Sequence, residues 1–217
     1  MDSYETIPEV IHNVCLKNPD KDAIIVGNKR VTYRELDVSI TNCAKAFLAA
    51  GVQPGDRVGL WAPNSAEWIV IALGIQSVGA ALVPINTRYK PGEAAYPLQK
   101  TKAKMLFTAD GFMGIEGEAV VAKIRQEGGH DIRTININED EAKEDSLSSF
   151  LSSAESNDGD HRSRSFTDIS ASTLCDIMFT SGSTGKPKGV RHLHGPTVRQ
   201  TFNTIEENNL TDADRML

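Results

Sequence analysis

The stretch RVGLWAPNSAEWIVIALGIQSVGAALVPIN (57–86) decides the fold class. RVGLWA (57–62) is a short, nearly continuous apolar run, which is typical of a buried strand. Pro63-Asn64-Ser65 can cap the helix that follows, and AEWIVIALGIQSVGA (66–80) is apolar almost all round, which indicates a buried helix. ALVPIN (81–86) predicts a second strand. A strand, a helix and a strand in this order favour a parallel α/β unit.

The same rhythm extends to both sides of this unit. AIIV (23–26) and RVTY (30–33), separated by a Gly27-Asn28 turn, predict a β-hairpin. A helix is expected where apolar residues recur from Leu36 to Phe47, and Gly51 ends it. Residues 91–136 predict a short helix with a break at Pro97, then a strand, a helix and a strand. The predicted fold class is therefore α/β, with largely parallel sheets flanked by helices.

Residues 138–172 differ from the rest of the chain in composition. They are rich in Glu, Asp and Ser, and only Leu147, Phe150 and Leu151 form a short amphipathic piece. This composition indicates a solvated connection.

Charge and cysteine usage limit the class of protein. The net charge of −6 argues against a nucleic-acid partner. The acidic, polar N-terminus does not resemble a signal peptide, and the apolar stretch from Trp68 to Pro84 is broken by Gln76 and glycines, so it falls short of a membrane span. Three widely separated cysteines fit reduced thiols in a cytoplasmic protein.

TSGSTGKPKG (180–189) is the segment that carries chemistry. It follows the strand signal TLCDIMF (173–179) and precedes a helix expected from Pro196 onward, and such a loop suits an anion. Glycines let the backbone present N–H groups to a ligand, hydroxyl groups add donors, and lysines add positive charge. A Walker loop is excluded because position 180 is Thr rather than Gly. A flexible Ser/Gly surface loop is the alternative interpretation.

TSGSTGKPKGV (180–190) resembles the phosphate-binding loop of the adenylate-forming, or AMP-binding, superfamily, which includes the acyl-CoA synthetases. The stretches RVTYREL (30–36), 49–86 and TRYKPGEAAYPLQKTKAKMLFT (87–108) are similar to the N-terminal region of the same family. The resemblance implies that ATP activates a carboxylate to an acyl-adenylate with release of pyrophosphate, and that the acyl group then passes to coenzyme A. It also implies Mg²⁺ as a cofactor and a role in fatty acid metabolism.

The resemblance implies a set of site residues. The loop positions match those that wrap the β- and γ-phosphates, Thr184 also matches a residue whose hydroxyl can ligate Mg²⁺, and the catalytic residues would be Lys188 and Thr184. The ATP-binding set is Thr180, Ser181, Gly182, Ser183, Thr184, Gly185 and Lys188. His194 matches a family histidine, although Leu193 replaces the usual hydroxyl residue before it, so a structural capping role and a ligand role both remain open.

The family segments that hold adenine, acyl group and ribose do not occur in residues 190–217, and LTDADRML (210–217) ends as if a further strand begins. We therefore expect residues 1–217 to be an incomplete N-terminal domain that is inactive alone, with 173–217 as a strand–loop–helix unit carrying the phosphate loop.

Two alternatives remain. One is a non-catalytic nucleotide-binding or interaction fragment; the other is a superfamily member with a carrier-protein or other acceptor. A small-molecule carboxylate is the expected partner, and an exposed sheet edge leaves a homo-oligomer open.

Overall fold

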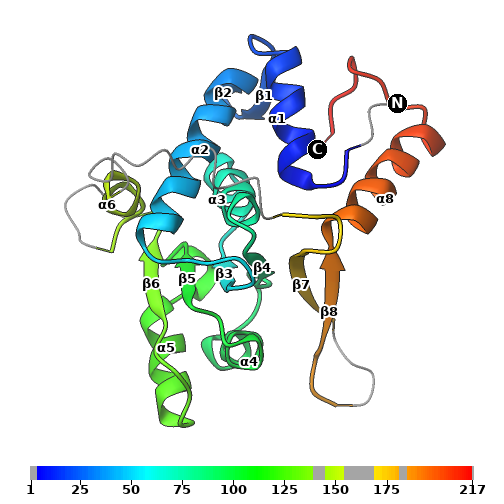
Figure 1. The fold of residues 1–217 in the computed structure, drawn as a ribbon. Coiled ribbons are helices and arrows are strands. Elements are labelled where there is room, and N and C mark those ends of the chain that lie inside the picture. The colour runs from blue at the N-terminus through cyan, green and yellow to red at the C-terminus, as the bar shows by residue number, and fades with distance from the viewer. Residues whose placement is uncertain (1–3, 139–144, 154–168, 181–184, 217) are drawn as a thin grey trace.

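The computed structural model describes residues 4–138, 145–153, 169–180 and 185–216. Six strands form one sheet in the order β6-β5-β3-β4-β7-β8, and β1 and β2 form a separate two-stranded sheet (Figure 1). The strands are β1 (Asp22–Val26), β2 (Lys29–Thr32), β3 (Arg57–Trp61), β4 (Ala81–Pro84), β5 (Met105–Thr108), β6 (Arg133–Asn136), β7 (Leu174–Thr180) and β8 (Lys188–Leu193). The helices are α1 (Ile7–Lys17), α2 (Tyr33–Ala49), α3 (Ala66–Ser77), α4 (Pro91–Thr101), the 3-10 turn η1 (Phe112–Gly114), α5 (Gly117–Gln126), α6 (Leu147–Ser152) and α8 (His194–Glu207).

The β3–α3–β4 unit confirms the parallel arrangement predicted for 57–86. β3 pairs in parallel with β4 on one side and β5 on the other, so Val58 lies opposite both Leu82 and Met105. From Val58 to Trp61 the strand is fully buried, as expected when helices cover both faces of a parallel sheet. Ser65 caps α3 by accepting a hydrogen bond from the amide of Trp68 at 3.1 Å.

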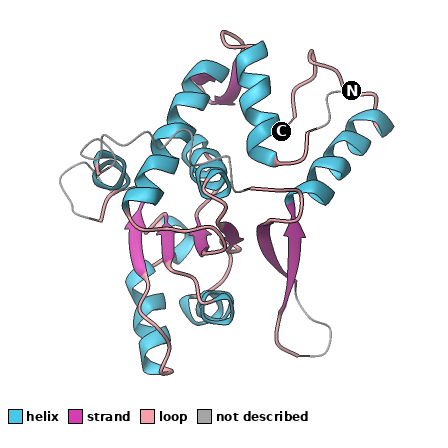
Figure 2. Cartoon of the chain, in the orientation of Figure 1, coloured by secondary structure: helices cyan, strands magenta, loops and turns pink. Residues whose placement is uncertain are grey.

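Two helical layers cover the central sheet, as Figure 2 shows. α2, α3 and α6 pack on one face, where the rings of Phe47, Phe107 and Phe150 meet edge to face with centroids 5.1–5.4 Å apart. α4 and α5 pack on the other face around Trp61 and Leu98, both fully buried. The sheet thus separates two apolar cores.

The hairpin and the helices differ from their predictions only in detail. β1 and β2 pair antiparallel, with Val26 opposite Lys29 and Gly27 at a φ of 58°, which confirms the hairpin. The break expected at Pro97 is wrong, because α4 continues through this residue to Thr101. Pro97 can lie inside the helix because its ring is buried and only one backbone donor is lost.

The acidic connection 138–172 contains one element of the core. Its amphipathic piece forms α6, and Phe150 is 1% exposed. Ser146 caps this short helix by accepting from the amide of Ser149. Ring packing on Phe47 and Phe107 overrides the polar composition of the segment. Residues 139–144 and 154–168 of the connection lie outside the described residues.

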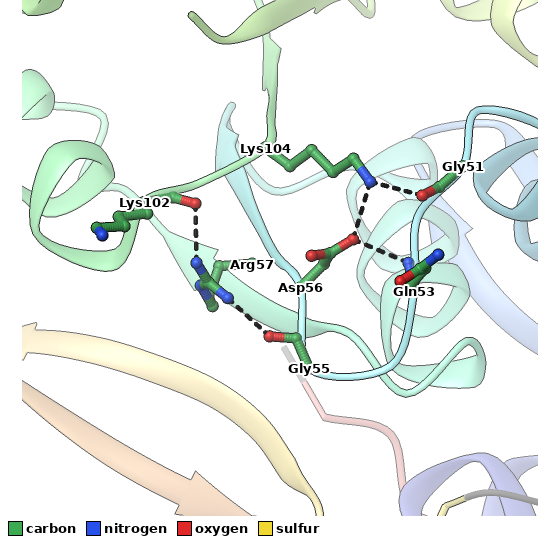
Figure 3. A network of polar contacts seen from close by, with 7 residues as sticks. All are labelled: Gly51, Gln53, Gly55, Asp56, Arg57, Lys102 and Lys104. Atoms are coloured by element: carbon green, nitrogen blue, oxygen red, sulfur yellow. Dashed lines mark hydrogen bonds and ion pairs between the residues drawn. The ribbon is translucent and has the colours of Figure 1, made fainter. Parts of the chain in front are cut away.

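Arg57 joins the start of β3 to the end of α4 (Figure 3). Its guanidinium donates to the carbonyl oxygens of Thr101, Lys102 and Gly55 at 2.5, 3.0 and 2.9 Å. Two of these carbonyls belong to the C-terminal turn of α4, where unpaired acceptors and the helix dipole favour a cation. Lys104 forms a second link of this kind. Its ammonium donates a hydrogen bond to the carbonyl oxygen of Gly51 and another, at 3.1 Å, to the carboxylate of Asp56.

Across the described ranges, no helix combines the length and the apolar character needed to cross a bilayer.

Replacement of Arg57 by Met should lower the free energy of unfolding by about 2 kcal/mol, because three carbonyls lose a charged donor. Chemical denaturation of the 217-residue chain measures the change. Arg125→Met is the matched control: Arg125 pairs with Asp131 at an exposed position, so its loss should change stability by less than about 0.5 kcal/mol. Equal effects of the two substitutions would contradict this interpretation of Arg57.

Candidate functional site

The Gly/Ser/Thr/Lys loop connects two strands of a hairpin. β7 lies in parallel beside β4 and antiparallel to β8, and Thr180 pairs with Lys188 at the base of the loop. The helix of this unit, α8, begins at His194, two residues before the expected Pro196. The predicted strand–loop–helix unit therefore contains an additional strand, β8, which sequence reasoning missed. Residues 188–191 are all exposed, so β8 lacks the apolar pattern that marks a buried strand.

The described part of the loop places three of the predicted site residues. Thr180 ends β7 and Lys188 begins β8, both are exposed, and the Thr180 hydroxyl donates to the Lys188 carbonyl at 3.5 Å. Gly185 has a φ of 151°, a value that favours glycine. The remaining predicted ligands, Ser181, Gly182, Ser183 and Thr184, lie outside the described residues.

The loop lies at the carboxyl edge of the sheet. β4 and β7 are parallel neighbours, so the loop after Thr180 and the segment after Pro84 leave the sheet at the same edge. The second of these segments carries the exposed Arg88 and Lys90. Crevices at this edge of an open α/β sheet are the usual position of ligand sites, and basic side chains there favour an anion.

A close contact between an aspartate and a histidine of the hairpin was not anticipated. Asp176 is 8% exposed and faces His192 on β8, whose Nδ1 lies 2.9 Å from the carboxylate in an orientation that makes no hydrogen bond. The thiol of Cys175 donates to the other carboxylate oxygen at 3.4 Å. Burial raises the pKa of this thiol to about 11, so Cys175 is a donor and not a nucleophile. The signal for this pair was a single Asp within the apolar run LCDIMF.

His194 has a structural role. It is fully buried at the start of α8, and its Nδ1 accepts a hydrogen bond from the amide of Ile7 at 3.3 Å. Ile7 is the first residue of α1, so the imidazole satisfies one of the unpaired amides of that helix. Of the two roles left open by the sequence, the structure supports capping, directed at a helix 187 positions away.

A cavity of about 630 Å³ lies elsewhere, between β2, α2, α3 and α6. Lys29 and Arg30 at its rim are paired with Glu67 and Asp22. None of its lining residues belongs to β7, β8 or α4. Its size is typical of ligand pockets, but none of its lining residues belongs to the loop that carries the predicted phosphate-binding residues.

The fold and the hairpin loop define a class, an α/β protein with a Gly/Ser/Thr/Lys loop at the carboxyl edge of its sheet. Comparison with known proteins narrows the class. Residues 11–217 match the model of the AMP-binding enzyme family. The chain belongs to this family.

Relatives of known name support the same assignment. The chain is 30% identical to a 7a-methyl-1,5-dioxo-octahydro-1H-inden-4-yl propanoyl:CoA ligase of Mycobacterium tuberculosis, over 100% of this chain and 42% of the relative. It is 28% identical to the putative acyl-CoA synthetase YngI of Bacillus subtilis, over 98% of this chain and 42% of the relative. Both are named as coenzyme A ligases or acyl-CoA synthetases, and the chain spans less than half the length of each.

A solved structure supports the fold. The putative long-chain-fatty-acid CoA ligase of Rhodopseudomonas palustris superimposes with a TM-score of 0.79 at 22% identity, covering 96% of this chain and 49% of the other. The predicted α/β fold, with largely parallel sheets flanked by helices, is therefore confirmed as the N-terminal part of the adenylate-forming fold, and the observed sheet is mixed because β8 is antiparallel.

Protonation of His194 should destabilise the fold at acidic pH. Burial lowers its pKa from 6.5 to about 4, so the unfolded chain binds the proton more tightly and stability falls as the pH drops from 6.5 toward 4. The loss by pH 4 should be on the order of 3 kcal/mol. Unfolding measured against pH for wild type and His194→Gln should give a stability difference that shrinks over this range. A difference independent of pH would contradict the assignment of a neutral, buried imidazole.

Proposed function

We propose that the protein carrying this chain is an ATP-dependent acyl-CoA synthetase, an acid–thiol ligase. It would join a small carboxylic acid to AMP with release of pyrophosphate and then transfer the acyl group to coenzyme A. The observation that carries this proposal is the TSGSTGKPKG loop at the carboxyl edge of the sheet, in a chain that matches the AMP-binding family from residue 11 to 217.

The chemistry of the first step suits this loop. A carboxylate is ionised at neutral pH, so it can attack the α-phosphorus of ATP without a general base. The bond from the α-phosphorus to the bridging oxygen breaks, and pyrophosphate leaves with the electron pair. The protein must then position the phosphates and offset their accumulated negative charge.

The loop residues would divide this work. Backbone amides around Gly182 and Gly185 and the hydroxyls of Thr180, Ser181 and Ser183 would bind the β- and γ-phosphates. Lys188 would add positive charge beside them; it is exposed and forms no ion pair within the described ranges, so its ammonium fits a phosphate ligand. Thr184 would supply a hydroxyl ligand to Mg²⁺, which when bound would neutralise phosphate charge.

We further propose that residues 1–217 do not catalyse adenylation alone. This chain spans 42% of the coenzyme A ligase relative, and no segment for adenine or ribose was identified in 190–217. The small share of the relative that this chain spans also favours the second candidate function, a non-catalytic nucleotide-binding or interaction fragment. The acceptor in the second half-reaction could instead be a carrier-protein thiol, and we propose a cytoplasmic location.

In the complete protein, Lys188→Ala should lower the rate of carboxylate-dependent ATP–pyrophosphate exchange roughly a hundredfold. The reason is that the substitution removes a positive charge of the protein that would stabilise the departing pyrophosphate. Thr184→Ala should act in the same direction. Lys45→Ala is the matched control, since Lys45 lies on α2 across the sheet from Phe179 and should leave the rate unchanged. Unchanged activity of Lys188→Ala and Thr184→Ala would refute the loop assignment.

The 217-residue chain alone should show no exchange above background with a panel of carboxylic acids, and calorimetry should detect at most weak binding of ATP with Mg²⁺. The physical reason is that phosphate contacts alone leave adenine, ribose and acyl group unbound. Measurable exchange by this chain would overturn the proposal. Release of AMP by the complete protein only when coenzyme A is present would favour this acceptor over a carrier protein.

A further inference from the structure

Tyr96 on α4 contacts both limbs of the loop. Its ring meets that of Phe179, the residue before Thr180, edge to face, with centroids 6.1 Å apart and planes at 84°. On the other limb, the ammonium of Lys186 lies 5.7 Å from the centroid of the Tyr96 ring, within the range of a cation–π contact. A single half-buried side chain therefore contacts the chain on both sides of the segment 180–185.

Phe179 extends this contact to the opposite strand. It pairs with Gly189 on β8, and a Cβ atom at Gly189 would lie 3.1 Å from Cζ of Phe179 and 3.0 Å from Cγ2 of Ile177. These distances are tighter than ordinary van der Waals contact, so the bare glycine leaves room for the phenylalanine ring. The rings of Tyr96 and Phe179 and the backbone of Gly189 thus form a continuous series of contacts from α4 to β8.

The position of Lys186 also has an electrostatic component. Glu127 follows the last residue of α5, and its pKa is lowered mainly by the hydrogen bond from Lys123 and further by the charge of Lys186. Lys123 and Glu127 are 3.0 Å apart. The ammonium of Lys186 therefore lies beside the Tyr96 ring of α4 and interacts electrostatically with Glu127.

The backbone of Tyr96 is held in place by buried residues of α4. Its neighbours Ala95 and Pro97 are buried, and Leu98 is fully buried in the core beneath α4. The hydroxyl of Tyr96 makes no hydrogen bond within the described ranges, so the contacts to the loop come from the ring.

We propose that Tyr96 is a positioning residue for the phosphate loop, because its ring contacts Phe179 on one side of the loop and Lys186 on the other and holds these two residues at a fixed separation. The positioning role presupposes the proposed function, in which the loop binds ATP. The ring contacts of Tyr96 are observed independently of that function. Tyr96 acts through the loop and does not touch the reacting atoms. Because a triphosphate grip serves substrate and transition state alike, its loosening should raise the KM for ATP more than it lowers kcat.

The test compares Tyr96→Leu, which removes the ring, with Tyr96→Phe, which keeps it. In the complete protein, Tyr96→Leu should raise the KM for ATP about tenfold, with the KM for the carboxylate unchanged, and Tyr96→Phe should stay within about twofold of wild type. Phe179→Leu removes the partner ring and should act like Tyr96→Leu. Equal losses in Tyr96→Phe and Tyr96→Leu, or wild-type behaviour of Tyr96→Leu, would overturn the proposal.

A second measurement separates this proposal from the function. Hydrogen exchange at the backbone amides of the β7–β8 ladder in the 217-residue chain should accelerate in Tyr96→Leu and not in Tyr96→Phe. If the complete protein shows no ATP-dependent activity in any variant, the proposed function fails. The exchange data still test whether Tyr96 positions the two sides of the loop. Unchanged exchange in Tyr96→Leu would refute the positioning role of Tyr96 even in an active enzyme.

Discussion

The structure depends on the burial of β3 from both sides. A parallel strand cannot leave one face in water as an antiparallel hairpin can, so β3, β4 and β5 require a helical layer above and below. Each crossover helix is supplied by the segment that joins two strands, as α3 joins β3 to β4 and α4 joins β4 to β5. The same parallel direction gathers the loops after Pro84 and Thr180 at one edge. The candidate site is thus a consequence of how the core is buried.

Local patterns were enough to predict the elements that depend on this core. The strand–helix–strand unit at 57–86 and the hairpin at 22–32 followed from apolar runs, capping residues and a turn, all of which lie within a few positions of each other. The features that were missed depend on contacts between distant segments. The sequence marks Phe150 as part of a short amphipathic piece, but its place in the core depends on ring contacts with Phe47 and Phe107, which are distant in sequence.

The residue types of the candidate site could be interpreted from the sequence, and their phosphate-binding chemistry stays a prediction; the architecture around them could not be predicted. The residue types of 180–189 indicated an anion-binding loop, whereas β8 was missed because an exposed edge strand carries no burial pattern. Tyr96 had no signal at all, since its importance comes from Phe179 and Lys186, which lie more than 80 positions away. His194 illustrates the same limit, because a motif match could not reveal that its imidazole caps α1.

The two limbs of the loop are held by different forces. β7 is anchored in the sheet beside β4, and Cys175, Asp176 and Ile177 are buried there. β8 has only β7 as a strand neighbour among the described residues, and its residues 188–191 are exposed. Cross-strand hydrogen bonds and the Phe179–Gly189 packing therefore fix β8 relative to β7. Of the two strands, β8 has fewer neighbours and gains more from a contact outside the hairpin. The Tyr96 ring provides such a contact from a helix that is itself part of the buried core.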